Sequence, residues 1–74
     1  MEPSEIIRAL REDHDKTQTE IAKVLGIKQT VYSRYERAAH SLPVRHLKTL
    51  CEFYRVSADY ILGLPEGLNY PKRG

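Results

Sequence analysis

The chain has 74 residues, of which 41% are hydrophobic and 30% are charged, and its formal net charge is +2. This length favours one small domain, and the composition is that of a globular protein rather than a disordered one. No apolar run is long enough for a membrane span or a secretory signal, so we expect no membrane partner. The single cysteine, Cys51, excludes an internal disulfide framework and a cysteine-based zinc site, and it favours a reduced, cytoplasmic location.

Charge is distributed unevenly along the chain. Residues 1–15 hold two basic and five acidic side chains, residues 16–48 hold seven basic and two acidic ones, and residues 49–74 hold three of each. A basic middle in a nearly neutral chain is typical of a surface that faces phosphate groups. Taken without other features, this charge pattern is explained equally well by chance clustering and by a surface that faces phosphates.

Five short helices are predicted, and the first two have clear start signals. A helix over residues 3–13 begins with proline, whose missing N–H has no partner in a first helical turn anyway. Thr17 is a suitable N-cap for a second helix over residues 18–25, and a glutamate three positions later completes a capping box. Gly26 then ends this helix, as a left-handed glycine commonly does.

The third helix is expected to begin only two residues after the glycine and to run from Gln29 to about Arg37. Tyr32 and Tyr35 lie three positions apart and are expected to face inward, with their hydroxyls reaching the surface. Two helices of about eight residues joined by three residues, one of them a glycine, form a helix-turn-helix arrangement.

The fourth helix is predicted from Pro43 to about Tyr54, with an inner face at the spacing typical of a buried helix stripe. That face contains Leu47, Leu50, Cys51 and Tyr54. Ser57 is expected to cap a short fifth helix over residues 58–62, in which Tyr60 is also expected in the core. Residues 65–74 are rich in glycine and proline and are predicted to be a short tail after a domain over residues 1–64.

The outward face of the third helix carries hydrogen-bonding side chains and almost no acid. Gln29 can bond the N6 and N7 atoms of adenine, and Arg34 can bond O6 and N7 of guanine, each as a bidentate pair. Thr30 offers a hydroxyl to a base and a methyl to thymine. The simplest alternative is that these side chains form an ordinary solvated helix face.

Further side chains are candidates for contacts with the phosphate backbone. Gln18 and Lys28 lie near the starts of the second and third helices, where unpaired backbone N–H groups suit phosphates. Ser33, Arg37 and Arg45 are the remaining candidates, although exposed arginines need no ligand. The predicted DNA-binding set is therefore Gln18, Lys28, Gln29, Thr30, Ser33, Arg34, Arg37 and Arg45.

The stretch over residues 17–37, TQTEIAKVLGIKQTVYSRYER, closely resembles the phage repressor and Cro type of helix-turn-helix domain, also called the Xre type. The stretches IRALR at residues 7–11 and VSADYILG at residues 56–63 resemble the opening and closing helices of that family. The resemblance implies an all-α, compact five-helix fold of the lambda-repressor-like kind. It also implies sequence-specific operator binding, usually as a dimer on a two-fold symmetric site, with DNA contacts from Gln18, Gln29 and Arg34.

Two positions depart from the family pattern. Ala38 stands where glycine commonly follows the recognition helix, and alanine in a left-handed conformation costs about 1 kcal/mol. The helix is therefore expected either to end differently from that pattern or to run on into Ala39. Lys28 replaces the usual serine or threonine cap, which removes about 1 kcal/mol of capping but places a cation beside the groove.

Enzymatic and metal-binding functions are not favoured by the sequence. His14, His40 and His46 share no metal-ligand spacing, and Cys51 has no histidine or helix start to activate it. Glu20 and Glu36 are interpreted as a cap residue and a surface partner rather than an acid–base pair. We therefore expect no catalytic residues, no metal and no cofactor.

The leading hypothesis is a transcriptional regulator, most simply a repressor, that inserts its third helix into the major groove of a two-fold symmetric operator. A homodimer would then form through the fifth helix and the tail, where apolar side chains gather. Those side chains are Tyr60, Ile61, Leu64, Leu68 and Tyr70. The alternative is an antitoxin that binds a toxin partner and represses its own operon, and a module that has lost DNA binding is a third reading.

Overall fold

A computed structural model of the protein describes residues 2–65, and this part of the chain contains five α-helices and no strand. The helices are α1 (Pro3–Asp13), α2 (Gln18–Leu25), α3 (Gln29–Glu36), α4 (Val44–Tyr54) and α5 (Ala58–Leu62). The predicted all-α, five-helix fold is confirmed, with each boundary within one residue of its expected position. Among the described residues no helix has the length and apolarity that crossing a membrane requires.

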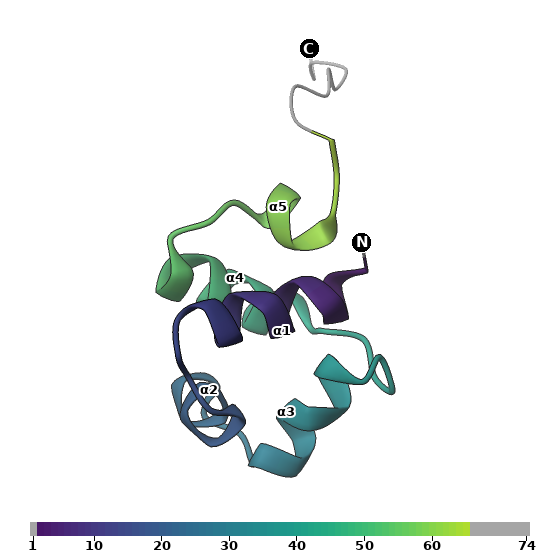
Figure 1. Ribbon diagram of the computed structural model, residues 1–74. Helices are drawn as coiled ribbons and strands as arrows, with labels where there is room; N and C mark the ends of the chain where they lie inside the picture. The colour runs from purple at the N-terminus through teal and green to yellow at the C-terminus, as the bar shows by residue number, and fades with distance from the viewer. Residues whose placement is uncertain (1, 66–74) are drawn as a thin grey trace.

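The helices enclose one small core. Figure 1 shows α1 across the middle of the molecule, with α2 and α3 on one side of it and α5 on the other. The closest packing joins α2 to α3, and further contacts join α1 to α3 and α5, and α4 to α2 and α5. The apolar core consists of Ile6, Ile7, Leu10, Ile21, Ala22, Tyr32, Tyr35, Leu50, Tyr54 and Ile61. Because helices this short are unstable alone, this shared core holds them in place.

Side-chain caps define the starts of α2 and α5. The Thr17 hydroxyl accepts a hydrogen bond from the Glu20 backbone N–H at 3.1 Å, and the Glu20 carboxylate accepts one from the Thr17 N–H at 3.0 Å. The Ser57 hydroxyl accepts a hydrogen bond from the Tyr60 N–H at 3.1 Å. Both predicted caps are confirmed, and each satisfies backbone donors that the first helical turn leaves unpaired.

All five helices end in the same way. In each case a backbone N–H beyond the helix bonds to a carbonyl five residues earlier, over a residue with positive φ. The positive-φ residues are Asp15 (54°), Gly26 (71°), Ala38 (58°), Arg55 (58°) and Gly63 (72°). After α3 the Ala39 N–H bonds to the Arg34 carbonyl at 2.8 Å. α3 therefore ends in the left-handed way despite the alanine, and both expectations, a different ending and a continuation into Ala39, are wrong.

Two predictions about the inward faces are wrong. Tyr60 is 54% exposed rather than buried, because Ile61 occupies the inward position of the short α5 and is completely buried. The hydroxyl of Tyr32 does not reach the surface; like that of Tyr54, it is buried without a hydrogen-bond partner among the described residues. His46, which the sequence did not place in the core, is buried on α4.

Candidate nucleic-acid interface

The turn between α2 and α3 is built on Gly26. Its φ and ψ of 71° and 31° lie in the left-handed region, and the next residue, Ile27, donates to the Ala22 carbonyl at 2.9 Å. A Cβ at Gly26 would meet nothing within 4 Å, so backbone strain rather than space favours glycine here. Ile27 is partly buried and packs against the core between the two helices.

The two faces of α3 differ as the sequence predicted. Tyr32 is completely buried and Tyr35 is 8% exposed, and their rings meet edge to face with centroids 6.5 Å apart. Thr30 and Arg34 are exposed on the other side of the helix. A helix anchored by two buried tyrosines presents its remaining side chains in fixed directions, which is what reading base edges requires.

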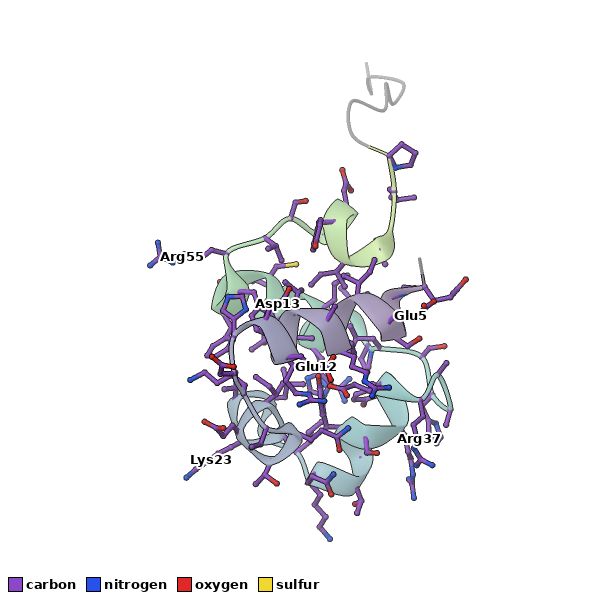
Figure 2. All side chains as sticks on the ribbon, viewed as in Figure 1. Glu5, Glu12, Asp13, Lys23, Arg37 and Arg55 are labelled. Atoms are coloured by element: carbon purple, nitrogen blue, oxygen red, sulfur yellow. The ribbon has the colours of Figure 1, made fainter. Side chains whose placement is uncertain are left out.

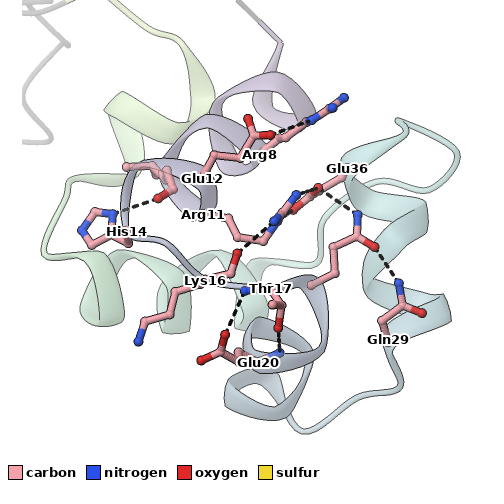
Figure 3. A network of polar contacts seen from close by, with 11 residues as sticks. Arg8, Arg11, Glu12, His14, Lys16, Thr17, Glu20, Gln29 and Glu36 are labelled. Carbon is pink, nitrogen blue, oxygen red and sulfur yellow. Dashed lines mark hydrogen bonds and ion pairs between the residues drawn. The ribbon is translucent and has the colours of Figure 1, made fainter.

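Gln18 and Gln29 lie together at the starts of the two helices. The Gln29 amide nitrogen Nε2 donates to Gln18 Oε1 at 2.6 Å, and Gln18 Nε2 donates to Glu36 Oε1 at 3.0 Å (Figure 3). This chain of bonds leaves one N–H and the carbonyl oxygen of the Gln29 amide available. Those are the two groups that a bidentate contact with adenine uses.

Glu36 is held from its other side by Arg11. Arg11 Nε and Nη2 donate to the two carboxylate oxygens at 2.7 and 3.1 Å, and Arg11 Nη1 donates to the Lys16 carbonyl at 2.9 Å. The Glu36 side chain is only 2% exposed and that of Arg11 14%. Glu36 is therefore a buried partner of α1, and its interpretation as a surface residue is wrong.

The bonds at Glu36 also decide its charge. Burial alone would raise the pKa of this carboxyl, but the Arg11 guanidinium, and after it the neighbouring Tyr32 hydroxyl and the Gln18 amide, outweigh burial and lower the pKa below its ordinary value. The hydrogen bond to Glu36 likewise raises the pKa of Arg11, so the pair remains charged at neutral pH. Next to it, burial raises the pKa of the Tyr54 phenol to about 12. The ion pair thus fixes α1 to the end of α3 and holds Gln18 in place.

The remaining predicted site residues lie at the surface without ion pairs in the described structure. Lys28 occupies the N-cap of α3 with no side-chain cap bond, as expected, and is exposed. Arg37 follows the last turn of α3 and points outward (Figure 2), while Ser33 is half-buried. Arg45 is exposed in the first turn of α4, and no ion pair joins its side chain to α3 within residues 2–65.

Sequence reasoning missed the Arg11–Glu36 pair and the Gln18–Gln29 bond. A signal for the pair was present, because Glu36 is the only acid between residues 21 and 51. An isolated acid in a basic segment indicates a specific cationic partner, but the sequence does not say that the partner lies on α1.

Comparisons with known proteins agree with this geometry. The family model described as "Helix-turn-helix" matches residues 7–61. The antitoxin PezA of Streptococcus pneumoniae is 36% identical over 63 residues, and the uncharacterized HTH-type transcriptional regulator YobD of Bacillus subtilis is 38% identical over 60 residues. These matches cover 85% and 81% of this chain but only 40% and 54% of the two relatives, so the chain spans about half the length of the curated proteins that it matches.

A solved structure has the same fold. The P22 c2 repressor, crystallised in complex with a synthetic operator, matches with a TM-score of 0.77 and 27% identity. The match covers 84% of this chain and 94% of the repressor chain. The chain therefore belongs to the helix-turn-helix family, within the phage repressor and Cro type.

Proposed function

We propose that the protein is a sequence-specific regulator of transcription, most simply a repressor, that inserts α3 into the major groove of operator DNA. The observation that carries this proposal is the Gln18–Gln29 bond of 2.6 Å, which engages one N–H of the Gln29 amide and leaves the other N–H and the oxygen for a base. Thr30 and Arg34 on the same face complete the base-reading set. The likeness to the P22 c2 repressor, whose structure contains an operator, supports the same function.

Phosphate contacts supply most of the affinity in this proposal, and base contacts supply the specificity. Lys28, Ser33, Arg37 and Arg45 are assigned to the backbone, together with the start of α2 at Gln18. Each neutralised phosphate releases condensed counterions, so affinity should fall steeply as salt increases. The proposed location for such a regulator is the cytoplasm, where it meets the chromosome.

The experiment that tests this function is selection of bound sequences from random double-stranded DNA, followed by a salt titration on the selected site. An enriched motif with two-fold symmetry and half-sites about 34 Å apart is the expected result. Gln29→Ala should then lose about 1–3 kcal/mol on the selected site and little on random DNA. No enrichment over a non-binding protein would exclude sequence-specific binding.

The proposed assembly is a homodimer through α5 and the tail. Tyr60, Leu62 and Leu64 are 54%, 44% and 39% exposed, which makes this end of the molecule apolar. Ile61, which we expected to contribute, is buried and cannot take part. Leu68 and Tyr70 lie outside the described residues, as does most of the proposed tail over residues 65–74. Sedimentation of Leu64→Glu against the unmodified chain tests this interface.

A second candidate function is that of an antitoxin. The similarity to PezA over 85% of this chain favours it, and in this case the chain would bind a toxin as well as its own operator. Co-purification of the tagged protein from its source cell separates the two functions, because only an antitoxin should retain a stoichiometric toxin partner.

A further inference from the structure

A groove between α2 and the end of α4 lies apart from the Gln18–Gln29 pair. It is lined by Lys16, Glu20, Lys23, Val24 and Phe53, and its volume is about 400 Å³. Val24 and Phe53 are 38% and 39% exposed, so a solvent-open apolar surface lies between two lysines. Apolar surface rimmed by charged groups is typical of an interaction site.

The charges around this groove are unbalanced. The Glu20 carboxylate already accepts a hydrogen bond from the Thr17 N–H at 3.0 Å, as part of the cap of α2. Lys16 and Lys23 form no ion pair within residues 2–65. The groove therefore holds two ammonium groups against one carboxylate, a net charge of +1 beside an apolar surface, and a ligand that carries carboxylates next to apolar side chains would complement it.

The groove also faces away from the proposed base-reading residues. Figure 3 shows the Lys16 side chain leaving the α1–α2 connection on the side opposite Gln29 and Glu36. Figure 2 shows Lys23 pointing outward from α2. A phosphate backbone would satisfy the lysines but gain nothing from Val24 and Phe53, whereas a protein segment would bury both.

We propose that this groove binds an acidic amphipathic segment of a partner protein. Its apolar side chains would cover Val24 and Phe53, and its carboxylates would pair with Lys16 and Lys23, which is the helix-in-groove mode of recognition. The proposal goes beyond DNA binding and does not depend on it, because no residue of the groove belongs to the proposed DNA-binding set.

The test uses two labelled helical peptides that share one leucine face, one with glutamate on the other face and one with lysine. The acidic peptide should bind at least about tenfold more tightly, a difference of about 1.4 kcal/mol, and its affinity should fall with salt. Phe53→Ala should weaken binding of the acidic peptide about tenfold, as truncation of an aromatic anchor does. Lys23→Glu should weaken it about fivefold, whereas Lys48→Glu, an exposed lysine of α4 outside the groove, should change nothing.

Val24→Glu provides a second groove variant whose side chain is exposed, so a loss of peptide binding with an unchanged melting temperature reports the groove itself. Equal binding of both peptides, or unchanged binding by Phe53→Ala and Val24→Glu, would overturn the proposal. A Lys23→Glu variant that loses DNA affinity but keeps peptide affinity would overturn it as well and make the lysine a phosphate contact. Phe53→Ala should bind selected DNA normally, which separates this site from the proposed function.

Discussion

Arg11 and Glu36 lie 25 positions apart in the sequence and meet through two hydrogen bonds of 2.7 and 3.1 Å. This pair is almost inaccessible to solvent and joins the first helix to the end of the third. Because Gln18 bonds to the same carboxylate, the pair also sets the position of the side chain that holds Gln29. One buried carboxylate thus connects the stability of the fold to the proposed reading of bases.

Glu36→Gln should destabilise the protein by about 3 kcal/mol, because it leaves the Arg11 guanidinium buried without its counter-charge. Urea unfolding monitored by circular dichroism measures this change. Glu12→Gln is the matched control, since the Arg8–Glu12 pair is exposed and spans 3.7 Å. That control should change stability by no more than about 0.5 kcal/mol. Equal losses in the two variants would mean that burial gives the Arg11–Glu36 pair no special weight.

His46 should make the protein less stable in mild acid. Burial, and then the charge of Arg45, lower the pKa of this imidazole, and its Nε2 is buried with no hydrogen-bond partner in the described part of the chain. The unfolded chain therefore binds a proton at a higher pH than the folded one. Stability is fully present above the unfolded pKa of about 6.5 and is lost as pH falls from there toward the folded pKa.

The measurement for His46 is the free energy of unfolding between about pH 7 and pH 5, a window set by the unfolded pKa. His46→Gln should flatten the dependence of the unfolding free energy on pH. His40→Gln, a change at an exposed histidine, should leave that dependence as in the unmodified chain. A slope that persists in His46→Gln would assign the acid sensitivity to another group.

Ala38→Gly should stabilise the protein by about 0.5–1 kcal/mol, because alanine is strained at a φ of 58° and glycine is not. Thermal unfolding measures this gain. Ala39→Gly provides the comparison: Ala39 has no positive φ, so this variant should gain no stability. A lower melting temperature for Ala38→Gly would mean that the added freedom of the unfolded chain outweighs the relief of strain.

Arg34→Ala should cost about 1–3 kcal/mol of binding to selected DNA and relax the preference at one base pair. If Arg37 contacts only phosphate, Arg37→Ala should weaken binding to all sequences alike. It should also reduce the slope of log affinity against log salt concentration by about one. Anisotropy titrations on selected and random duplexes distinguish the two. Equal losses of Arg34→Ala on both duplexes would contradict its role in base recognition.

The sequence predicted the local features of the fold well and its long-range contacts poorly. Thr17, Ser57 and Gly26 act on backbone groups within a few residues, so their effects on helix boundaries follow from their own chemistry. The burial of Tyr32 and Tyr35 follows from their spacing in the same way. A five-residue helix such as α5 is too short for the spacing of its apolar residues to show which face is buried, and Tyr60 was therefore placed on the wrong face.

The predicted site was incomplete for a related reason. Gln18 and Gln29 were each identified as candidates, but their mutual bond depends on the angle between two helices. Arg11 was not identified at all, because only the packing of α1 on α3 brings it to Glu36. His46 was missed because its neighbours on α4, Leu47 and Cys51, are more apolar and were expected to take the inward positions that they only partly occupy.

The shared form of the five helix ends has a consequence for exchange with solvent. In each, one amide beyond the helix is tied to a carbonyl of the last turn, and these amides belong to Lys16, Ile27, Ala39, Val56 and Leu64. Although they lie in connections, they should exchange hydrogen for deuterium more slowly than connection amides that form no hydrogen bond among the described residues. In nuclear magnetic resonance spectra, protection should therefore extend past each helix as far as these amides, and the turn into α3 should be as persistent as the helices it joins.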